Sequence, residues 1–178
     1  MSQSLSVVII TLNEEANIGR TLASVADLVR QTNGEIIVVD SGSTDRTVEI
    51  AREAGALVSQ HEFTNYVMQK QMALDRATGD WVLLMDADEQ ATHDLGEEIV
   101  RAVNSASASQ GYRIRRVLYH LGHYYPFGLF PDRPVRLFRR ELGHIGGIDP
   151  HDRVEVAGAI GKLRAPILHF SYRDISDH

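Results

Sequence analysis

The stretch DWVLLMDADEQ, residues 80–90, decides how the rest of this sequence is interpreted. Its apolar run, 81–85, has the length of a buried strand, and an Asp-Ala-Asp-Glu segment at 86–89 follows it directly. Three carboxylates within four positions repel one another at the end of such a strand. We therefore expect a ligand that needs negative charge to bind beside this strand end.

The N-terminal half alternates between apolar runs and helical patterns. After the first run, apolar residues recur at helical spacing from Ile18 to Val29, and Asn13 can cap this helix. The predicted strands are 5–12, 35–40, 56–60 and 80–87, and the predicted helices are 13–31, 43–55 and 65–79. Strands that are apolar on both faces and alternate with helices are typical of a parallel sheet covered by helices. The expected fold class is therefore α/β.

The pattern changes after residue 92. One more helix is predicted at 93–106, followed by strand-like segments at 112–122, 133–140 and 163–172 and an aromatic, proline-rich loop at 124–134. We expect one domain over 1–178. Within it, 1–92 form a nucleotide-binding type of half and 93–178 an irregular half around the same sheet.

The composition is that of an ordinary globular domain, with 178 residues, 43% hydrophobic and 24% charged. Because the sequence has no Cys, a disulfide framework and a thiolate metal site are excluded. The longest apolar runs are about five residues, whereas a membrane-spanning helix needs roughly 20. The N-terminus lacks the blocks of a signal peptide, so we expect a cytoplasmic protein.

The two halves differ in charge. Residues 1–90 carry 6 Lys and Arg against 14 Asp and Glu, whereas 91–178 carry 12 against 10. The segment 111–140 has seven Arg and one acid, Asp132. This asymmetry indicates that the halves face different partners, although a solvated basic face is the common alternative. The acidic total and the lack of any DNA- or RNA-reading motif argue against a nucleic acid partner.

Polar side chains follow three of the predicted strands where ligands of open α/β sheets bind. They are Thr11, Asn13 and Glu14 after the first strand, Asp40 and Ser41 after the second, and Asp86 and Asp88 after the fourth. Neither phosphate-binding glycine motif, G-x-x-x-x-G-K-[ST] or G-x-G-x-x-G, is present at the first strand. An Asp-x-Asp pair instead supplies the oxygen ligands that Mg²⁺ or Mn²⁺ accepts together with a diphosphate.

Three segments together resemble a known family. VVIITLNEEANI, EIIVVDSGSTDRTVEIA and QMALDRATGDWVLLMDADE are similar, in order and spacing, to family 2 glycosyltransferases with the GT-A fold. The resemblance covers 5–92 and continues more loosely to 172. DSGSTD, DADE, PDRPVRLFRR, PHDRVEVAG and PILHFSY most resemble bacterial enzymes of the lipopolysaccharide inner core. Those sequences usually continue past this end point, which leaves open that part of the C-terminal half is missing.

The resemblance implies a GT-A fold, in which a Rossmann-like, mostly parallel sheet is flanked by helices and 93–178 form the acceptor side. The implied nucleotide-binding residues are Thr11, Asn13, Glu14, Asp40, Ser41, Lys70 and Asp86. Asp88 is implied as a ligand of Mg²⁺ or Mn²⁺, with His151 as the additional ligand in first place and His169 as the alternative. For Lys70 the competing interpretation is a solvated helix lysine.

An inverting transfer also needs a base that deprotonates the acceptor hydroxyl. Similar sequences carry His-Glu where this chain has His151 and Asp152, so the resemblance implies Asp152, with Asp149 and Glu155 as competitors. Arg133, Arg136 and Arg139 are the expected acceptor-binding residues, because an anionic acceptor or membrane surface is attracted to them.

The function implied is a metal-dependent inverting glycosyltransferase. It would move a sugar from a nucleotide-diphosphate sugar, with UDP expected, to a glycan or glycolipid acceptor in lipopolysaccharide core synthesis, in contact with the inner membrane surface. The alternatives are a sugar-1-phosphate nucleotidyltransferase, disfavoured by the missing Gly-rich basic loop after the first strand, and a non-catalytic nucleotide- or glycan-binding domain.

Overall fold

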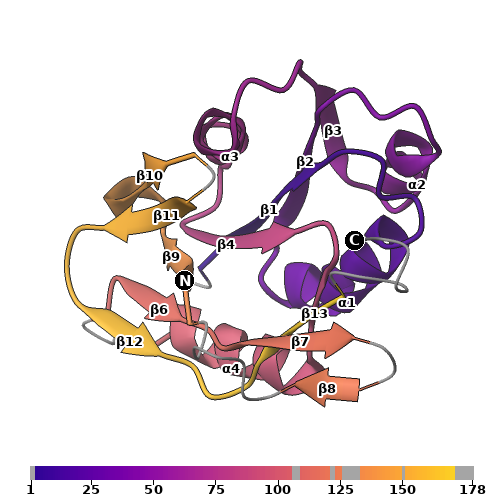
Figure 1. Cartoon of the computed structure of the whole chain (residues 1–178). Helices are drawn as coiled ribbons and strands as arrows, with labels where there is room; N and C mark the ends of the chain where they lie inside the picture. The colour runs from indigo at the N-terminus through magenta and orange to yellow at the C-terminus, as the bar shows by residue number, and fades with distance from the viewer. Residues whose placement is uncertain (1–2, 106–108, 121–122, 126–132, 150, 171–178) are drawn as a thin grey trace.

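A seven-stranded sheet forms the centre of the computed structural model (Figure 1). The described residues are 3–105, 109–120, 123–125, 133–149 and 151–170. In spatial order the strands are β12 (Ile160–Lys162), β6 (Gly111–Arg113), β9 (Val135–Arg139), β4 (Trp81–Asp86), β1 (Leu5–Thr11), β2 (Glu35–Asp40) and β3 (Leu57–Gln60).

The N-terminal strands of this sheet are parallel, as the apolar runs predicted. β1 pairs in parallel with both β2 and β4, and β2 pairs in parallel with β3. Parallel strands need crossover connections, which the helices α1 (Ile18–Gln31), α2 (Thr47–Glu53) and α3 (Tyr66–Leu74) supply. The carboxyl ends of β1, β2 and β4 therefore lie side by side.

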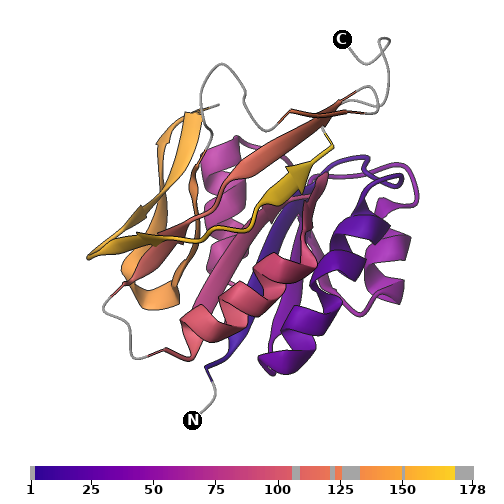
Figure 2. The same ribbon diagram turned by 90° about the horizontal axis from the view of Figure 1, so that it is seen from below.

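Helices cover both faces of the sheet (Figure 2). Val7 and Ile9 of β1 pack in one hydrophobic cluster with residues of α1, α2 and α4 (His93–Val103). Val8, between them, packs in a second cluster with Ala73 and Leu74 of α3. Because successive strand residues point to opposite faces, this split explains why β1 is apolar without alternation.

The C-terminal half adds antiparallel strands around the site. β9 pairs antiparallel with β4, and β6 pairs antiparallel with β9. A second sheet contains β5 (Glu89–Ala91), β13 (Ile167–His169), β7 (Arg116–His120) and β8 (His123–Tyr125) in that order. A separate hairpin is formed by β10 (Gly143–Ile148) and β11 (His151–Val156), preceded by a 3-10 turn at Arg140–Leu142. The expected α/β class, with a mostly parallel sheet, is confirmed.

Some predicted boundaries were wrong. The first helix begins at Ile18 rather than at residue 13, because Asn13 has a positive φ of 52° that a helix does not allow. The predicted strand 112–122 is two strands in different sheets, β6 and β7. Most of the predicted loop 124–134 lies outside the described residues. Where the chain is described, none of its helices has the length and apolar character needed to cross a membrane.

Candidate functional site

One cavity opens at the carboxyl ends of β1, β2 and β4, and a second opens between the end of β4 and the hairpin. We call the first the strand-end cavity; it measures about 390 Å³ and is lined by Ile10, Thr11, Leu12, Glu14, Ser41, Phe63, Tyr66, Asp86, Ala87, Asp88 and His169. We call the second the hairpin cavity; it measures about 570 Å³ and is lined by Tyr66, Lys70, Leu84, Asp86, Arg116, Pro134, Val135, Arg136 and residues 151–154 of β11. Asp86 and Tyr66 line both, so the two cavities meet at these side chains.

A residue that lines the strand-end cavity has a buried side-chain hydroxyl with no hydrogen-bond partner in the described part of the chain. It is Oγ1 of Thr11, a residue that is only 5% exposed. Leaving such a group unpaired costs about 1–3 kcal/mol, so a ligand that bonds to it is favoured. Ser41 lies in the same cavity and accepts a hydrogen bond from Nε2 of Gln69 at 3.0 Å. The rings of Phe63 and Tyr66 meet edge to face at 5.2 Å beside them.

Asp40 and Asn13 do not line this cavity. Asp40 is completely buried, and its Oδ2 accepts hydrogen bonds from the backbone N–H groups of Gly42 and Ser43 at 3.0 and 2.9 Å. The side chains of Ser43 and Gln60 also donate to Asp40. Oδ1 of Asn13 accepts from the backbone N–H of Thr44 at 2.9 Å. Asn13 thus joins the loop after β1 to the loop after β2, whereas Asp40 fixes the loop after β2 itself.

Asp88 is accompanied by His169. Nε2 of His169 lies 3.1 Å from Oδ2 of Asp88, and both side chains are about four-fifths buried. This contact arises because β13 pairs antiparallel with β5, which places His169 opposite Glu89. His151 begins β11 and lines the hairpin cavity instead, so the structure does not bring it to Asp88.

The Asp88–His169 pair fits a hard divalent cation that is also held by a diphosphate. The described residues contain no cluster of three or more His, Cys, Asp or Glu that could hold a metal ion. Mg²⁺ is commonly bound through one or two protein ligands together with substrate phosphates and water rather than in an all-protein cage. Asp88 supplies such a carboxylate on the wall of the strand-end cavity, and His169 places a ring nitrogen beside it.

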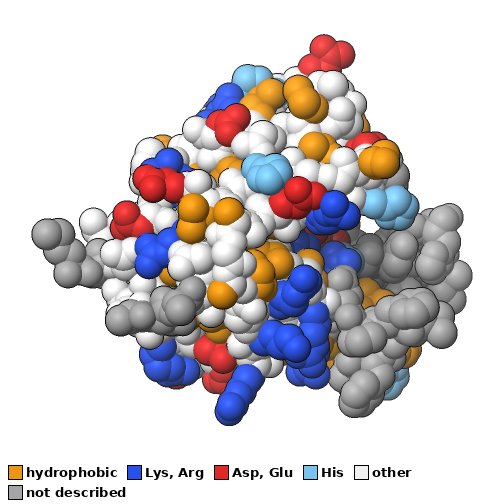
Figure 3. Space-filling view, turned by 90° about the vertical axis from the view of Figure 1, so that its left-hand side faces the viewer, with side chains coloured by type: hydrophobic (Ala, Val, Ile, Leu, Met, Phe, Trp, Pro, Cys, Tyr) orange, Lys and Arg blue, Asp and Glu red, His pale blue; other side chains and the backbone are white. Residues whose placement is uncertain are grey.

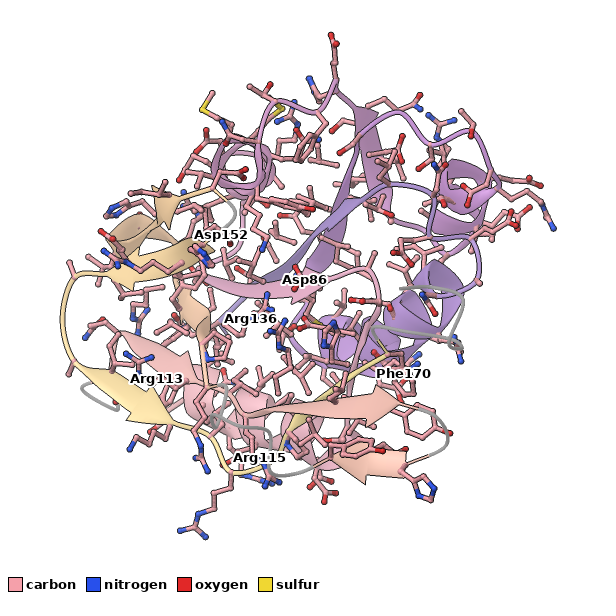
Figure 4. The ribbon with its side chains drawn as sticks, viewed as in Figure 1. Asp86, Arg113, Arg115, Arg136, Asp152 and Phe170 are labelled. Atoms are coloured by element: carbon pink, nitrogen blue, oxygen red, sulfur yellow. The ribbon has the colours of Figure 1, made fainter. Side chains whose placement is uncertain are left out.

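Lys70 connects the two acids that line the hairpin cavity. Its Nζ lies 2.8 Å from Oδ2 of Asp152 and 3.3 Å from Oδ1 of Asp86. Only 9% of the Lys70 side chain is exposed, so the solvated-lysine interpretation does not apply. Figure 4 shows Asp86 at the end of β4 and Asp152 beside the hairpin strand β11.

Arg136 and Glu89 contact Asp86 from the interior of the protein. Nη2 of Arg136 is 2.8 Å from Oδ2 of Asp86 and 2.9 Å from Oε1 of Glu89, which is completely buried. The backbone N–H of Asp86 donates to Oε2 of Glu89 at 2.9 Å. Nη1 of Arg116 lies farther from the same carboxylates, at 3.6 Å from Asp86 and 3.5 Å from Glu89. Three acids and three cations therefore form one balanced network, made of Asp86, Glu89, Asp152, Lys70, Arg116 and Arg136.

The network shifts the pKa values of the neighbouring carboxyls of Asp86 and Glu89 in opposite directions. Burial alone would raise the pKa of Asp86, but the charges of Arg136 and Lys70 outweigh it and hold that pKa well below its ordinary value. Burial raises the pKa of Glu89, and the charge of Asp86 acts in the same direction against the attraction of Arg136. The charges of Arg136 and Lys70 thus favour the ionised form of Asp86, the member of this carboxyl pair that lines both cavities.

The three arginines expected to bind an acceptor do not lie together. Arg136 is buried in the network, whereas Arg133 is exposed and accepts on its carbonyl a hydrogen bond from Arg113. Arg139 stacks 4.7 Å above the ring of Trp81, at the opposite end of β4 from Asp86. Residues three apart on a strand point to opposite faces, which explains the separation of Arg136 from Arg139.

Of the three candidate bases, Asp152 is the one that lines a cavity. Oδ1 of Asp149 accepts a hydrogen bond from the backbone of Tyr66 at 2.7 Å. Glu155 pairs with Arg153 at 2.8 Å, and this hydrogen bond and the charge of Arg153 lower its pKa. Asp152 also has a partner, Lys70, so its place on the wall of the hairpin cavity is what distinguishes it from the two competitors.

Sequence reasoning missed Phe63, Tyr66 and Gln69. Phe63 and Tyr66 flank Asn65, whose side chain caps α3 by accepting from Met68 N–H at 2.8 Å. Aromatic residues beside the start of a predicted helix could have indicated that Phe63 and Tyr66 line the ligand cavity. The partner of Gln69 in the loop after β2 had no such local signal, because it lies 28 residues away.

Residues 6–156 match the family model described as Glycosyl transferase family 2. The lipopolysaccharide core biosynthesis glycosyltransferase LpsC of Rhizobium meliloti is 32% identical over 174 residues, which cover 93% of this chain and 63% of LpsC. A protein of Rickettsia felis named as an uncharacterized glycosyltransferase is 33% identical over 181 residues, 95% of this chain and 62% of that protein. The chain thus spans less than two thirds of the length of these relatives.

Solved structures share the fold. TarS 1-349 of S. aureus, in complex with UDP-GlcNAc, has a TM-score of 0.73 at 19% identity, covering 96% of this chain and 59% of that one. Glucosyl-3-phosphoglycerate synthase of Mycobacterium tuberculosis, with Mn²⁺, UDP and glucosyl-3-phosphoglycerate, has a TM-score of 0.63 at 21% identity, covering 98% and 74%. The expected GT-A fold is confirmed. With the family match over most of its length, the chain belongs to glycosyl transferase family 2.

Proposed function

We propose that the chain transfers a sugar from a nucleotide-diphosphate sugar, with UDP as the nucleotide, to a hydroxyl group of a glycan or glycolipid. The observation that carries this proposal is the meeting of two cavities at Asp86. A donor bound in the strand-end cavity and an acceptor in the hairpin cavity would have their reacting ends at this shared wall.

The strand-end cavity would hold the donor. The unpartnered hydroxyl of Thr11 and the side chain of Ser41 would bond to the nucleoside, and Phe63 offers an aromatic edge to the base. Glu14 also lines this cavity, and in the loops behind it Asp40 and Asn13 would keep the lining in place. The TarS complex with UDP-GlcNAc supports UDP as the nucleotide.

Asp88 and His169 would hold Mg²⁺ or Mn²⁺ against the donor diphosphate. When bound, the cation offsets the charge that develops on the leaving diphosphate. The glucosyl-3-phosphoglycerate synthase complex with Mn²⁺ and UDP supports a divalent metal for this family. His169 replaces His151 in this assignment because of its contact with Asp88.

Asp152 would act as the base. The proton of the acceptor hydroxyl moves to the Asp152 carboxylate while the acceptor oxygen bonds to the anomeric carbon. The bond between that carbon and the diphosphate oxygen breaks, and its electron pair leaves with UDP. A single displacement of this kind inverts the anomeric centre. Lys70 orients Asp152 for this step through the 2.8 Å ion pair.

The acceptor would be a sugar of the lipopolysaccharide core or of another envelope polysaccharide. The similarity to LpsC supports this class. Lys and Arg side chains gather on the face that carries the hairpin (Figure 3). Arg113 of β6 and Arg153 of β11 are exposed arginines of the neighbouring strands. We expect this face to approach the inner membrane surface or an anionic acceptor on its cytoplasmic side.

Calorimetric titration of UDP with and without Mn²⁺, on the wild type and on Asp88→Ala, tests the donor assignment. UDP binding that requires Mn²⁺ and is lost in Asp88→Ala would support it, and UDP-sugars would then be screened for hydrolysis and transfer. Absence of UDP binding under both conditions would reject UDP. Binding without any turnover would instead favour a non-catalytic nucleotide-binding domain.

A further inference from the structure

The ion pair of Arg136 and Glu89 is buried more deeply than any acid or base that the proposed reaction uses. Arg136 is 5% exposed and Glu89 is 0% exposed. Arg136 also donates to the carbonyl oxygen of Leu84. Removing two charges from water costs several kcal/mol, and apolar replacements of similar volume are often equally stable or more so. Stability alone therefore does not explain why the charges are here.

Asp86 is fixed at three points, two of them by this pair. Glu89 accepts the backbone N–H of Asp86, and Arg136 binds Oδ2 of its carboxylate. Oδ1 is bound by Lys70, the residue that also holds Asp152. Rotation of the Asp86 side chain would break contacts with both cations at once. The carboxylate at the junction of the two cavities is thus held in one orientation.

We propose that Arg136 and Glu89 are positioning residues for the transfer, which fix Asp86 and, through Lys70, align Asp152 with the acceptor. This inference rests on the proposed function. Asp86 then acts as an anchor between the cavities, because both of its oxygens are bound by cations. The metal is left to Asp88 and His169, which lie on the other side of the shared wall.

The guanidinium is the chemical group that this position requires. Its planar fork reaches Asp86, Glu89 and the Leu84 carbonyl in one plane of donors, whereas a lysine ammonium is a point charge on a flexible chain. A lysine at this position would keep the balance of charge but lose part of the geometry. The substitution Arg136→Lys therefore tests whether the geometry of the donors matters beyond the positive charge.

The main test is the double variant Glu89→Gln with Arg136→Met. It removes one negative and one positive charge together, keeps similar volumes, and leaves an amide oxygen to accept the Asp86 N–H. We expect an unchanged midpoint of urea unfolding and a Kd for UDP with Mn²⁺ within about threefold of the wild type. We expect kcat for UDP-sugar turnover to fall about 100-fold, the effect of a misplacement of roughly 1 Å.

Arg136→Lys is the second variant, in case the double variant does not fold. We expect about a tenfold loss of kcat with the same Kd for UDP. Arg140→Met is the matched control: Arg140 also donates to a backbone carbonyl, that of Gly79 at 2.9 Å, but at the far end of β4. Its kcat should equal that of the wild type.

Either of two results would overturn the inference. One is a kcat of the double variant, or of Arg136→Lys, that equals the wild-type value. The other is a crystal structure of the double variant in which the Asp86 carboxylate and its distance to Lys70 are unchanged. The second result is independent of turnover. A wild-type protein that binds UDP but turns over no UDP-sugar would count against the proposed function instead.

Discussion

The strand-end cavity and the hairpin cavity share a wall but are built in opposite ways. The polar residues of the first follow directly after β1, β2 and β4, and one of them, Thr11, has an unpartnered hydroxyl. The charges of the second come from segments as far apart as Lys70 and Asp152, which are separated by 82 positions. In the second cavity the acids and cations of the network compensate one another.

This difference indicates different tasks. An unsatisfied polar group at a cavity wall gains free energy when a ligand binds, so the strand-end cavity favours binding. A compensated network of buried charges holds its members in fixed positions, and fixed charges lower the reorganisation needed during reaction. The hairpin cavity therefore favours catalysis. Substitutions in the first should change Kd, and substitutions in the second should change kcat.

The largest expected effect is that of Asp152→Asn. The amide has the same shape but does not accept the acceptor proton as a base, so kcat for transfer should fall by about 10²–10⁴. UDP binding with Mn²⁺ should remain, because Asp152 does not line the strand-end cavity. Steady-state kinetics and calorimetry on the same preparation check both parts. Glu155→Gln is the control, and an equal loss of kcat in that variant would contradict the assignment.

His169→Ala changes the strand-end cavity, so it should alter binding rather than kcat. Loss of an outer-shell partner typically weakens metal affinity about 10–100-fold, and loss of His169, one of the two proposed ligands, should weaken it by at least that much. The Mn²⁺ concentration needed for half-maximal UDP binding should rise by at least that factor. His151→Ala tests the alternative ligand from the hairpin cavity, and a larger effect there than in His169→Ala would return the assignment to His151.

The same comparison explains what the sequence could predict. Thr11, Ser41, Asp86 and Asp88 follow strands that local periodicity identifies, and parallel strands align their ends without further information. All four line the strand-end cavity. Asp40 was placed correctly at a strand end. Its Oδ2 accepts hydrogen bonds from the backbone of Gly42 and Ser43, a loop conformation that the sequence pattern does not predict.

Pairing between distant segments was less accessible to prediction. Arg136 belongs to an Arg-rich segment, and composition alone favours an exposed role for it. Its actual place follows from the antiparallel pairing of β9 with β4, in which Arg136 reaches Asp86 and Glu89. His169 lies beside Asp88 because β13 pairs with β5. The register of such pairs depends on turns and packing that no local pattern encodes.

Thr11→Val should have an effect of moderate size, and the effect should be on ligand binding in the strand-end cavity. The variant removes the unpartnered hydroxyl, so the free energy of unfolding should stay the same or rise, while the Kd for UDP should increase about fivefold, or roughly 1 kcal/mol. Thr21→Val is the matched control. Oγ1 of Thr21 donates to the carbonyl of Ala87 at 2.6 Å, so this variant should lose stability by about 1 kcal/mol. Urea unfolding and calorimetry of both variants distinguish ligand binding from structural bonding.

The smallest expected effect lies outside both cavities, at Glu35 at the start of β2. Oε1 of Glu35 accepts hydrogen bonds from the hydroxyl of Ser6 at 2.7 Å and from the backbone and hydroxyl of Thr78 at 2.8 Å. Burial acts to raise the pKa of Glu35, but these hydrogen bonds outweigh it, so the pKa lies below its ordinary value of 4.5. The ionised carboxylate is therefore better bound in the folded than in the unfolded protein.

A lowered folded pKa gives stability that is fully present above the unfolded value and is lost as the pH falls through the folded value. The wild type should thus exceed Glu35→Gln in the free energy of unfolding at pH 7 by a few tenths of a kcal/mol, since solvent screens this partly exposed carboxylate, and the difference should shrink below pH 4.5. Urea unfolding between pH 3 and 7 measures it. UDP affinity of the two proteins at pH 7 should be equal, because Glu35 lines neither cavity. A change in UDP affinity would mean that the start of β2 is coupled to its carboxyl end, and the division of tasks between the cavities would then not be local to them.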